Sequence, residues 1–172
     1  MFSLLTDTYF FTATVNSWKH LLKNNKNKEI IISSLQFCVR TKRIALHGFV
    51  IIPNHIHLLL TLGENDTTIS FQRDFLRFTA QQIIKKLIKD GRQNILNNFR
   101  STQKDRIYQI WERRLKWIAV SNQPIFLQKL NYIHQNPLQE HWQLSSDANS
   151  YYWSSAAYYE AGDDKFQILS QI

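Results

Sequence analysis

The sequence predicts an α+β fold in which helices pack on one face of an antiparallel β-sheet. Its 172 residues suit a single domain, and 44% of them are hydrophobic, which is enough to build a core. Alternating and β-branched segments are interspersed with segments whose apolar residues recur at helical spacing. The order of these segments is β-α-β-β-α-β-α, which is typical of a layer of helices packed on a sheet.

The first half of the chain contains three expected strands and one helix. Residues 8–15 (TYFFTATV) are β-branched and aromatic and predict the first strand. Apolar residues three and four positions apart predict a helix over residues 29–40. Residues 44–52 and 55–62 predict two further strands, and Pro53-Asn54 is typical of the turn that would join them.

The second half begins with the longest expected helix, residues 70–89, which has an apolar face and a basic face. Residues 92–106 are polar and predict a loop, and residues 107–120 predict a fourth strand. A last helix is expected from Asn122 to Asn136, where the following proline stops it. The single domain of residues 1–172 is thus expected to have its core at about 8–137 and an aromatic tail over 138–172.

The charge of the chain limits the class of its partner. The formal net charge of +8 favours phosphate polyanions or anionic membrane surfaces. The apolar stretches are too short to span a bilayer, and residues 1–5 are apolar but lack the basic residues of a signal peptide. The single cysteine, Cys38, excludes an intramolecular disulfide. We therefore expect a cytoplasmic, nucleoid-associated protein that binds nucleic acid and no membrane.

The first candidate for chemistry is His55-Ile56-His57 on the third expected strand. Residues i and i+2 of a strand point to the same side, so both imidazoles should project from one face. Two adjacent imidazoles form half of a metal site. A histidine pair at this spacing also arises by chance, so the tripeptide alone does not establish a site.

The second candidate is the pair Tyr132 and Asn136, four residues apart on the last expected helix. This spacing puts both side chains on one face of the helix. The alternative interpretation is structural: Tyr132 is a tyrosine at the edge of the core, and Asn136 is a helix C-cap. His134 lies two residues after Tyr132, well round the helix from it.

The third candidate is a basic stretch between residues 100 and 116, which contains six basic residues and only two acidic ones. Aromatic residues interleave with these cations, as in grooves that bind single strands through phosphates and stacked bases. The alternative is a solvated face above core tryptophans. The candidate DNA-binding residues are Arg100, Lys104, Arg106, Tyr108, Trp111, Arg113, Arg114 and Lys116.

These motifs together resemble those of a known family. Residues 50–60 (VIIPNHIHLLL) are similar to the metal-site strand pair of HUH single-tyrosine transposases. Residues 132–137 (YIHQNP) resemble the nucleophile helix in the REP-associated tyrosine transposase group, within the IS200-like superfamily. Residues 111–114 (WERR) and 152–156 (YWSSA) also fit this group. The similarity runs over most of the chain, and the four motifs occur in the family's order.

The resemblance implies a function and a role for individual residues. It makes His55 and His57 metal ligands, Tyr132 the nucleophile, and Asn136 a third ligand, where related transposases often have a glutamine. It also implies a ferredoxin-like fold, and cleavage of single-stranded DNA beside hairpins. Family members of this kind are monomers or dimers, so either state is expected.

The implied chemistry is coherent on physical grounds. A phenol with an ordinary pKa of about 10 is a weak nucleophile at neutral pH, and the phosphodiester that it attacks is anionic. A divalent cation, Mg²⁺ or Mn²⁺, polarises the phosphate, and imidazole ligands favour Mn²⁺. Attack by Tyr132 would leave a 5′-phosphotyrosine and a free 3′-hydroxyl, and so keep the bond energy for rejoining strands.

Two other functions stay open at the level of the sequence. One is a protein that recognises DNA hairpins but cuts them poorly or not at all. The other is a metal-dependent phosphoesterase that activates water, which would usually need carboxylate ligands such as Asp74 or Glu112 brought in by the fold.

Overall fold

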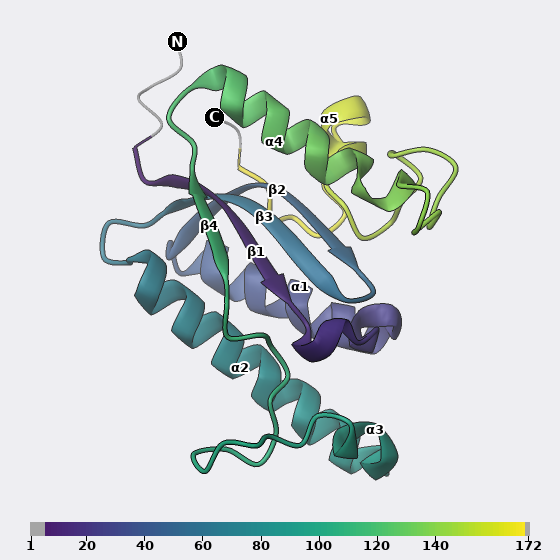
Figure 1. The fold of residues 1–172 in the computed structure, drawn as a ribbon. Coiled ribbons are helices and arrows are strands. Elements are labelled where there is room, and N and C mark those ends of the chain that lie inside the picture. The colour runs from purple at the N-terminus through teal and green to yellow at the C-terminus, as the bar shows by residue number, and fades with distance from the viewer. Residues whose placement is uncertain (1–5, 171–172) are drawn as a thin grey trace.

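The computed structural model describes residues 6–170, and the apolar segment 1–5 considered above lies outside the described residues. The fold contains a four-stranded sheet, which lies between helices (Figure 1). The strands are β1 (Thr8–Thr14), β2 (Ile44–Ile52), β3 (His55–Leu62) and β4 (Lys116–Ala119). The α-helices are α1 (Asn25–Arg40), α2 (Thr68–Lys89), α3 (Gln93–Asn97), α4 (Gln123–Gln135) and α5 (Ala156–Ala161). Short 3₁₀ turns are η1 (Asn16–Trp18), η2 (Leu21–Lys23) and η3 (Asn136–Leu138).

The sheet has the strand order β2-β3-β1-β4, and every neighbouring pair is antiparallel. β2 and β3 form a hairpin at the predicted Pro53-Asn54 turn, and their bounds are those predicted. β1 lies between β3 and β4 in the sheet, and neither of these strands follows it directly in the sequence. Helix α1 separates β1 from the β2–β3 hairpin, and helices α2 and α3 separate β3 from β4. The predicted ferredoxin-like α+β fold is confirmed.

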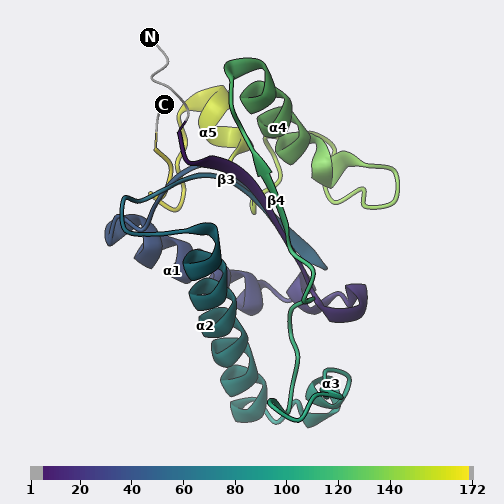
Figure 2. The same ribbon diagram turned by 60° about the vertical axis from the view of Figure 1, so that its left-hand side comes forward.

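Helices cover both faces of this sheet, whereas the sequence predicted one covered face. Figures 1 and 2 show α1 and α2 on one side and α4 on the other. Neighbouring residues of β1 contact the two layers: the Phe11 ring lies 6.2 Å from Phe71 of α2, and the Phe10 ring lies 5.9 Å from Tyr132 of α4. The physical reason is visible in β2, which is buried along nearly its whole length and therefore has two apolar faces to cover.

The fourth strand is much shorter than the predicted range 107–120. Residues 110–112 approach the end of β1 only through single contacts: the amide of Asn16 donates to Ile110 O, and Val15 forms an isolated bridge with Trp111. Regular pairing begins only at Lys116. The long segment between α3 and β4 is consequently irregular, and it extends away from α4 (Figure 2).

The aromatic tail is part of the core, so the predicted core boundary at residue 137 is wrong. Tyr151, Trp153 and Ile168 are buried in the same apolar cluster as the sheet. The tail lies along the outer edge of β2, where the amide of Ile51 donates to Trp153 O and the Tyr151 hydroxyl donates to Ile51 O. An exposed edge of β2 is thereby covered.

Over residues 6–170, no helix combines the length and the hydropathy that crossing a bilayer would need.

Candidate active site

The two histidines lie side by side on β3, as their spacing predicted. His55 pairs with Thr14 of β1 and His57 pairs with Thr12, so both imidazoles lie on the α4 side of the sheet. Their ring centroids are 4.6 Å apart, and both residues are buried. The backbone of a central strand thus fixes the spacing of the two rings.

Hydrogen bonds from neighbouring side chains orient both rings. Nδ1 of His55 lies 2.7 Å from Asn54 Oδ1, an acceptor, so Nδ1 carries the proton and Nε2 keeps its lone pair. Nδ1 of His57 lies 2.8 Å from Thr12 Oγ1, which can accept in the same way. Such contacts to the second ring nitrogen are typical of metal-binding histidines. His57 Nε2 is buried and has no hydrogen-bond partner within the described residues.

Both histidines are held in the neutral form. Burial lowers the pKa of His55 to about 4, and the nearby His141 adds to the effect. Burial also lowers the pKa of His57 well below its usual range, helped by His55, Lys116 and Lys129. Only a neutral imidazole has a lone pair for a cation, so the site is in its ligand form at neutral pH.

Helix α4 brings Tyr132 and Asn136 to the same place. The helix begins after Asn122, whose side chain accepts from the amide of Ile125, and it ends at Asn136 before Pro137. The Tyr132 ring centroid lies 5.3 Å from that of His57, and the residue is 43% exposed. Asn136 is 1% exposed, and its Oδ1 has no hydrogen-bond partner within the described residues.

The structural interpretations of these two residues also hold in part. Asn136 is the C-cap of α4, and its backbone amide donates to Ile133 O. Tyr132 lies at the edge of the core, where it contacts Phe10 edge-on at 5.9 Å between centroids. Neither role uses the Asn136 side-chain oxygen, which is the atom proposed as a ligand.

A cavity of about 450 Å³ joins these groups. It contains two cations, Lys116 from β4 and Lys129 from α4, and none of the described residues that line it is acidic. Trp18, which is 62% exposed, and Trp142 both lie near His55, at 6.3 and 6.2 Å between ring centroids. The described lining residues are Phe10, Thr12, Thr14, Trp18, His55, His57, Lys116, Ile118, Lys129, Tyr132, Asn136, Gln139, His141 and Trp142.

One predicted DNA-binding residue is part of the core. Trp111 is 6% exposed, and its Nε1 donates to Thr79 Oγ1 of α2 at 3.0 Å. Its ring is therefore unavailable for stacking on a base, which corrects the prediction. The reason is that Trp111 forms an isolated bridge with Val15 just after β1, and from there its side chain reaches Thr79 of α2.

The other predicted DNA-binding residues do not gather at one place. Lys116 lines the cavity of the histidines, and Arg113 and Arg114 are exposed just before β4. The remaining members lie in the loop that leads from α3: Arg100 pairs with Tyr108 in an isolated bridge, Lys104 is exposed, and Arg106 binds Asp105 at 2.7 Å.

Several lining residues were not singled out from the sequence. Lys129 lies three residues before Tyr132, a spacing that places both on one face of a helix, so its presence was foreseeable. Thr12 could have been found only from the pairing register of β1 with β3. Trp18 and Trp142 are far apart in the sequence, and only the fold brings them to the same histidine.

Of the seven tyrosines, all of which are described, Tyr132 alone lines this cavity. The tail is more ordered than the sequence suggested, but two of its phenols are engaged elsewhere: Tyr159 donates to His47 O at 2.7 Å, and burial raises its pKa to about 12. Burial likewise raises the pKa of Tyr151. His134 hydrogen-bonds with Ser155 at 2.9 Å on another side of α4.

The carboxylates considered as alternative ligands lie elsewhere. Asp74 binds Arg43 at 3.1 Å and Arg73 at 2.8 Å, and Glu112 accepts from the amide of Ser17 at 2.6 Å. Among residues 6–170, no three His, Cys, Asp or Glu side chains are grouped in a way that could hold a metal ion. Any metal at the histidine pair would therefore need further ligands such as the Asn136 amide, another neutral oxygen of the cavity lining, a phosphate or water.

Comparison with known proteins identifies similar sequences and folds. The chain is 34% identical over 89 residues to a protein of Haemophilus influenzae provisionally named a REP-associated tyrosine transposase, a match that covers 52% of this chain and 47% of the relative. The chain thus spans about half the length of this curated relative. No protein-family model matches the sequence.

Two solved structures are also similar to this fold. One is described as the REP-associated tyrosine transposase bound to a REP hairpin; it has a TM-score of 0.64 and 19% identity, over 100% of this chain and 96% of that one. The other is a provisionally named transposase of Deinococcus radiodurans, with a TM-score of 0.47 and 14% identity, over 73% of this chain and 87% of that one. The sequence match and the first fold match confirm the resemblance to the REP-associated tyrosine transposases that the motifs indicated.

Proposed function

We propose that this chain cuts and rejoins single-stranded DNA beside hairpins, with Tyr132 as the nucleophile and one divalent cation, Mg²⁺ or Mn²⁺, held by His55, His57 and Asn136. The proposal extends the similarity to transposases, which concerns about half of the curated relative, to a specific reaction. The relative of known structure was solved with a REP hairpin bound, and a hairpin substrate is inferred for this chain from that likeness.

The observation that carries the proposal is a pair of unpartnered acceptors in one cavity. His57 Nε2 and Asn136 Oδ1 are both buried without a hydrogen bond among the described residues, and both residues line the histidine cavity. A buried acceptor left unpaired costs about 1–3 kcal/mol, so two of them in one cavity are unfavourable unless something binds them. A cation accepts both lone pairs, and a set of two imidazole nitrogens and one amide oxygen tolerates Mn²⁺ better than Mg²⁺.

When bound, the cation would polarise the scissile phosphate and offset the charge that develops on its oxygens. The protein's own groups perform the remaining tasks. Lys116 and Lys129 give the cavity positive charge, and no described lining residue is acidic, so an anionic backbone is attracted to it. Trp18 and Trp142 offer faces on which unpaired bases can stack.

The proposed role of Tyr132 is supported by its place on a regular helix and by its contact with Phe10, which hold its ring at the cavity. Its oxygen would bond to phosphorus while the bond from phosphorus to the 3′ oxygen breaks, which leaves a 5′-phosphotyrosine and a free 3′-hydroxyl. With 43% of the residue exposed, the phenolic proton can pass to solvent, and the leaving 3′ oxygen takes up a proton from solvent to become the hydroxyl. Rejoining reverses the step when a 3′-hydroxyl attacks the phosphotyrosine.

The decisive experiment is to trap the covalent adduct on a labelled DNA hairpin with single-stranded flanks, in Mn²⁺. Wild type should form a protein–DNA adduct that survives denaturation, and Tyr132→Phe should form none while binding the hairpin as tightly. Tyr152→Phe is the matched control, because Tyr152 is 51% exposed and lies outside the cavity.

Each outcome of this experiment has a defined meaning. An adduct that persists in Tyr132→Phe, or that maps by mass spectrometry to another tyrosine, would overturn the assignment. Tight hairpin binding by wild type without any adduct would favour a recognition protein that does not cut. Metal-dependent cleavage without an adduct would favour a phosphoesterase that activates water.

A further inference from the structure

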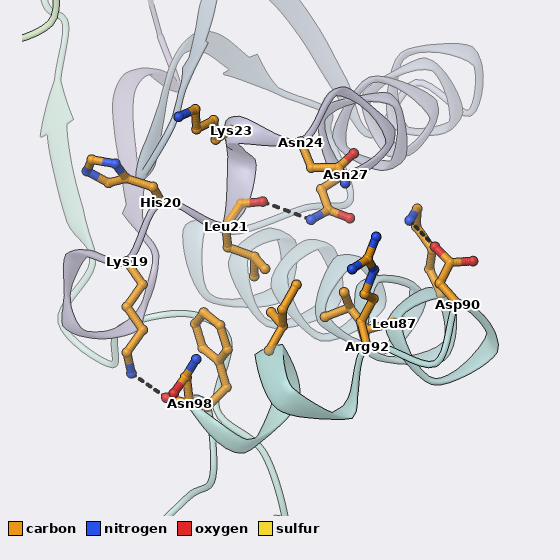
Figure 3. Close-up of a pocket in the computed structure, with 13 residues that line it drawn as sticks. Lys19, His20, Leu21, Lys23, Asn24, Asn27, Leu87, Asp90, Arg92 and Asn98 are labelled. Atoms are coloured by element: carbon orange, nitrogen blue, oxygen red, sulfur yellow. Dashed lines mark hydrogen bonds and ion pairs between the residues drawn. The ribbon is translucent and has the colours of Figure 1, made fainter.

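A second cavity, of about 940 Å³, lies between residues 19–27 and the region where α2 ends and α3 begins. Figure 3 shows the side chains that line it, which come from both segments. Four of them are basic, namely Lys19, Lys23, Lys86 and Arg92, and Asp90 is the one acidic residue among the described lining residues. This cavity shares no lining residue with that of the histidines.

Two of the four cations already have partners within the protein. Lys86 binds Asp90 at 2.5 Å, and Lys19 donates to Asn98 O while its ammonium group lies 4.9 Å from the centre of the Phe99 ring. Lys23 and Arg92 are exposed, and neither has an ion-pair partner within residues 6–170. These two cations are therefore available to an anion that enters the cavity.

The wall of the cavity also contains a buried acceptor. Asn27 is 1% exposed, and its Nδ2 donates to Leu21 O at 2.8 Å, which fixes the orientation of the amide. Its Oδ1 has no hydrogen-bond partner among the described residues, and Figure 3 shows Asn27 and Arg92 lining the same cavity. A ligand matched to this cavity supplies negative charge to the cations and an N–H donor to the amide.

The segment that carries Lys19 connects the two cavities. Trp18 lines the cavity of the histidines, and Lys19 and His20, the next two residues, line the basic one. The His20 ring also lies 5.4 Å from Trp142, which belongs to the histidine cavity. A strand that leaves the first cavity over residues 18–20 would therefore enter the second.

We propose that the basic cavity binds the single-stranded DNA that adjoins the strand held at Tyr132. Lys23 and Arg92 would contact its phosphates, and Asn27 Oδ1 would accept from the amino group of an unpaired base. Inorganic phosphate has no N–H donor, and a duplex has its pairing amino groups engaged, whereas a single strand offers both charge and free donors. The inference rests on the proposed function, because it assumes that a DNA strand occupies the histidine cavity.

The test compares two hairpins, one with a single-stranded flank at either end and one without a flank. Each flank has about 10 nucleotides, a length within the usual range of single-strand binding sites. Their affinities are measured by fluorescence anisotropy over a series of salt concentrations. The variant is Lys23→Gln with Arg92→Gln. The matched control is Lys85→Gln with Lys89→Gln, which removes equal charge from exposed positions of α2 outside the cavity.

Wild type and the control should bind the flanked hairpin more tightly than the bare one, and the Lys23/Arg92 variant should lose this difference. For binding of the flanked hairpin, the slope of log K against log salt concentration should become shallower by about 1.4 in this variant. The reason is that each of the two lost phosphate contacts to a single strand contributes about 0.7 to the slope. A flank of abasic nucleotides, which keeps the phosphates but lacks the amino groups, should bind wild type more weakly than a natural flank.

Equal flank dependence in wild type and in the Lys23/Arg92 variant would overturn the inference. So would an equal loss in the Lys85/Lys89 control, since the effect would then be one of net charge alone. The covalent adduct is scored separately on a hairpin with a minimal flank. Absence of an adduct in wild type, with the flank effect intact, would refute the proposed reaction and leave the basic cavity as a single-strand site.

Discussion

Replacing Asn136 with leucine distinguishes two effects of the proposed metal site: the destabilisation of the metal-free protein by a buried, unpaired oxygen, and the stabilisation that a bound metal provides. The Asn136 oxygen is buried without a partner, and leucine has a similar volume and no polar atom to satisfy. Removing an unsatisfied acceptor can recover part of its desolvation cost, which is about 1–3 kcal/mol. In metal-free buffer, Asn136→Leu should therefore be as stable as wild type or more stable, unlike most substitutions at a buried position.

Saturating metal should reverse this order of stability, so that wild type becomes more stable than Asn136→Leu. A ligand that binds only the folded protein stabilises it by about 2.7 kcal/mol at a concentration near 100 times its Kd. For a chain of this size, that corresponds to a rise in Tm of roughly 5–10 °C. Wild type should show this rise in saturating Mn²⁺, and Asn136→Leu should show a much smaller rise and lose adduct formation.

The assay is thermal and urea unfolding of both proteins, with EDTA and with Mn²⁺. Asn131→Leu is the matched control, since Asn131 is exposed on the same helix and outside the cavity. The control should keep the full response to Mn²⁺. A metal-free Asn136→Leu that is clearly less stable than wild type, or one that gains as much from Mn²⁺, would show that the amide oxygen is not a ligand.

Three further predictions follow from the same structure. Changing both His55 and His57 to alanine should abolish metal-dependent cleavage and leave hairpin binding nearly intact; cleavage by the double variant at the wild-type rate in Mn²⁺ would place the site elsewhere. DNA affinity should fall steeply with salt and should favour flanked hairpins over plain duplex, as measured by anisotropy, and equal affinity for random duplex would contradict the interpretation. Burial lowers the pKa of His47 below its usual 6.5 and that of His134 to about 4, so between about pH 4 and pH 6.5 the folded protein binds fewer protons at these residues than the unfolded chain does. The free energy of unfolding should consequently fall as the pH drops from about 6.5 toward 4, and His47→Gln should make the fall shallower in urea titrations; an unchanged pH profile in that variant would show that His47 does not contribute.

Local pattern determined much of the fold and the central pair of the site. Strand periodicity located β2 and β3 with their bounds, because apolar runs interrupted by Pro53-Asn54 leave few other arrangements. The same periodicity places His55 and His57 on one face, and helix periodicity unites Tyr132 with Asn136. These inferences hold because they depend on backbone geometry within a single element.

The relations between elements were decided only by the tertiary structure. The pairing of β1 with β3 brings Thr12 to His57, and the packing of α4 on that face of the sheet brings Tyr132 there as well. Trp111 is of a residue type that stacks on bases, but in the fold it packs into the core and donates to Thr79 of α2. Pairing register and burial depend on contacts between residues far apart in the sequence, and a single sequence records each residue's chemistry without recording its neighbours in space.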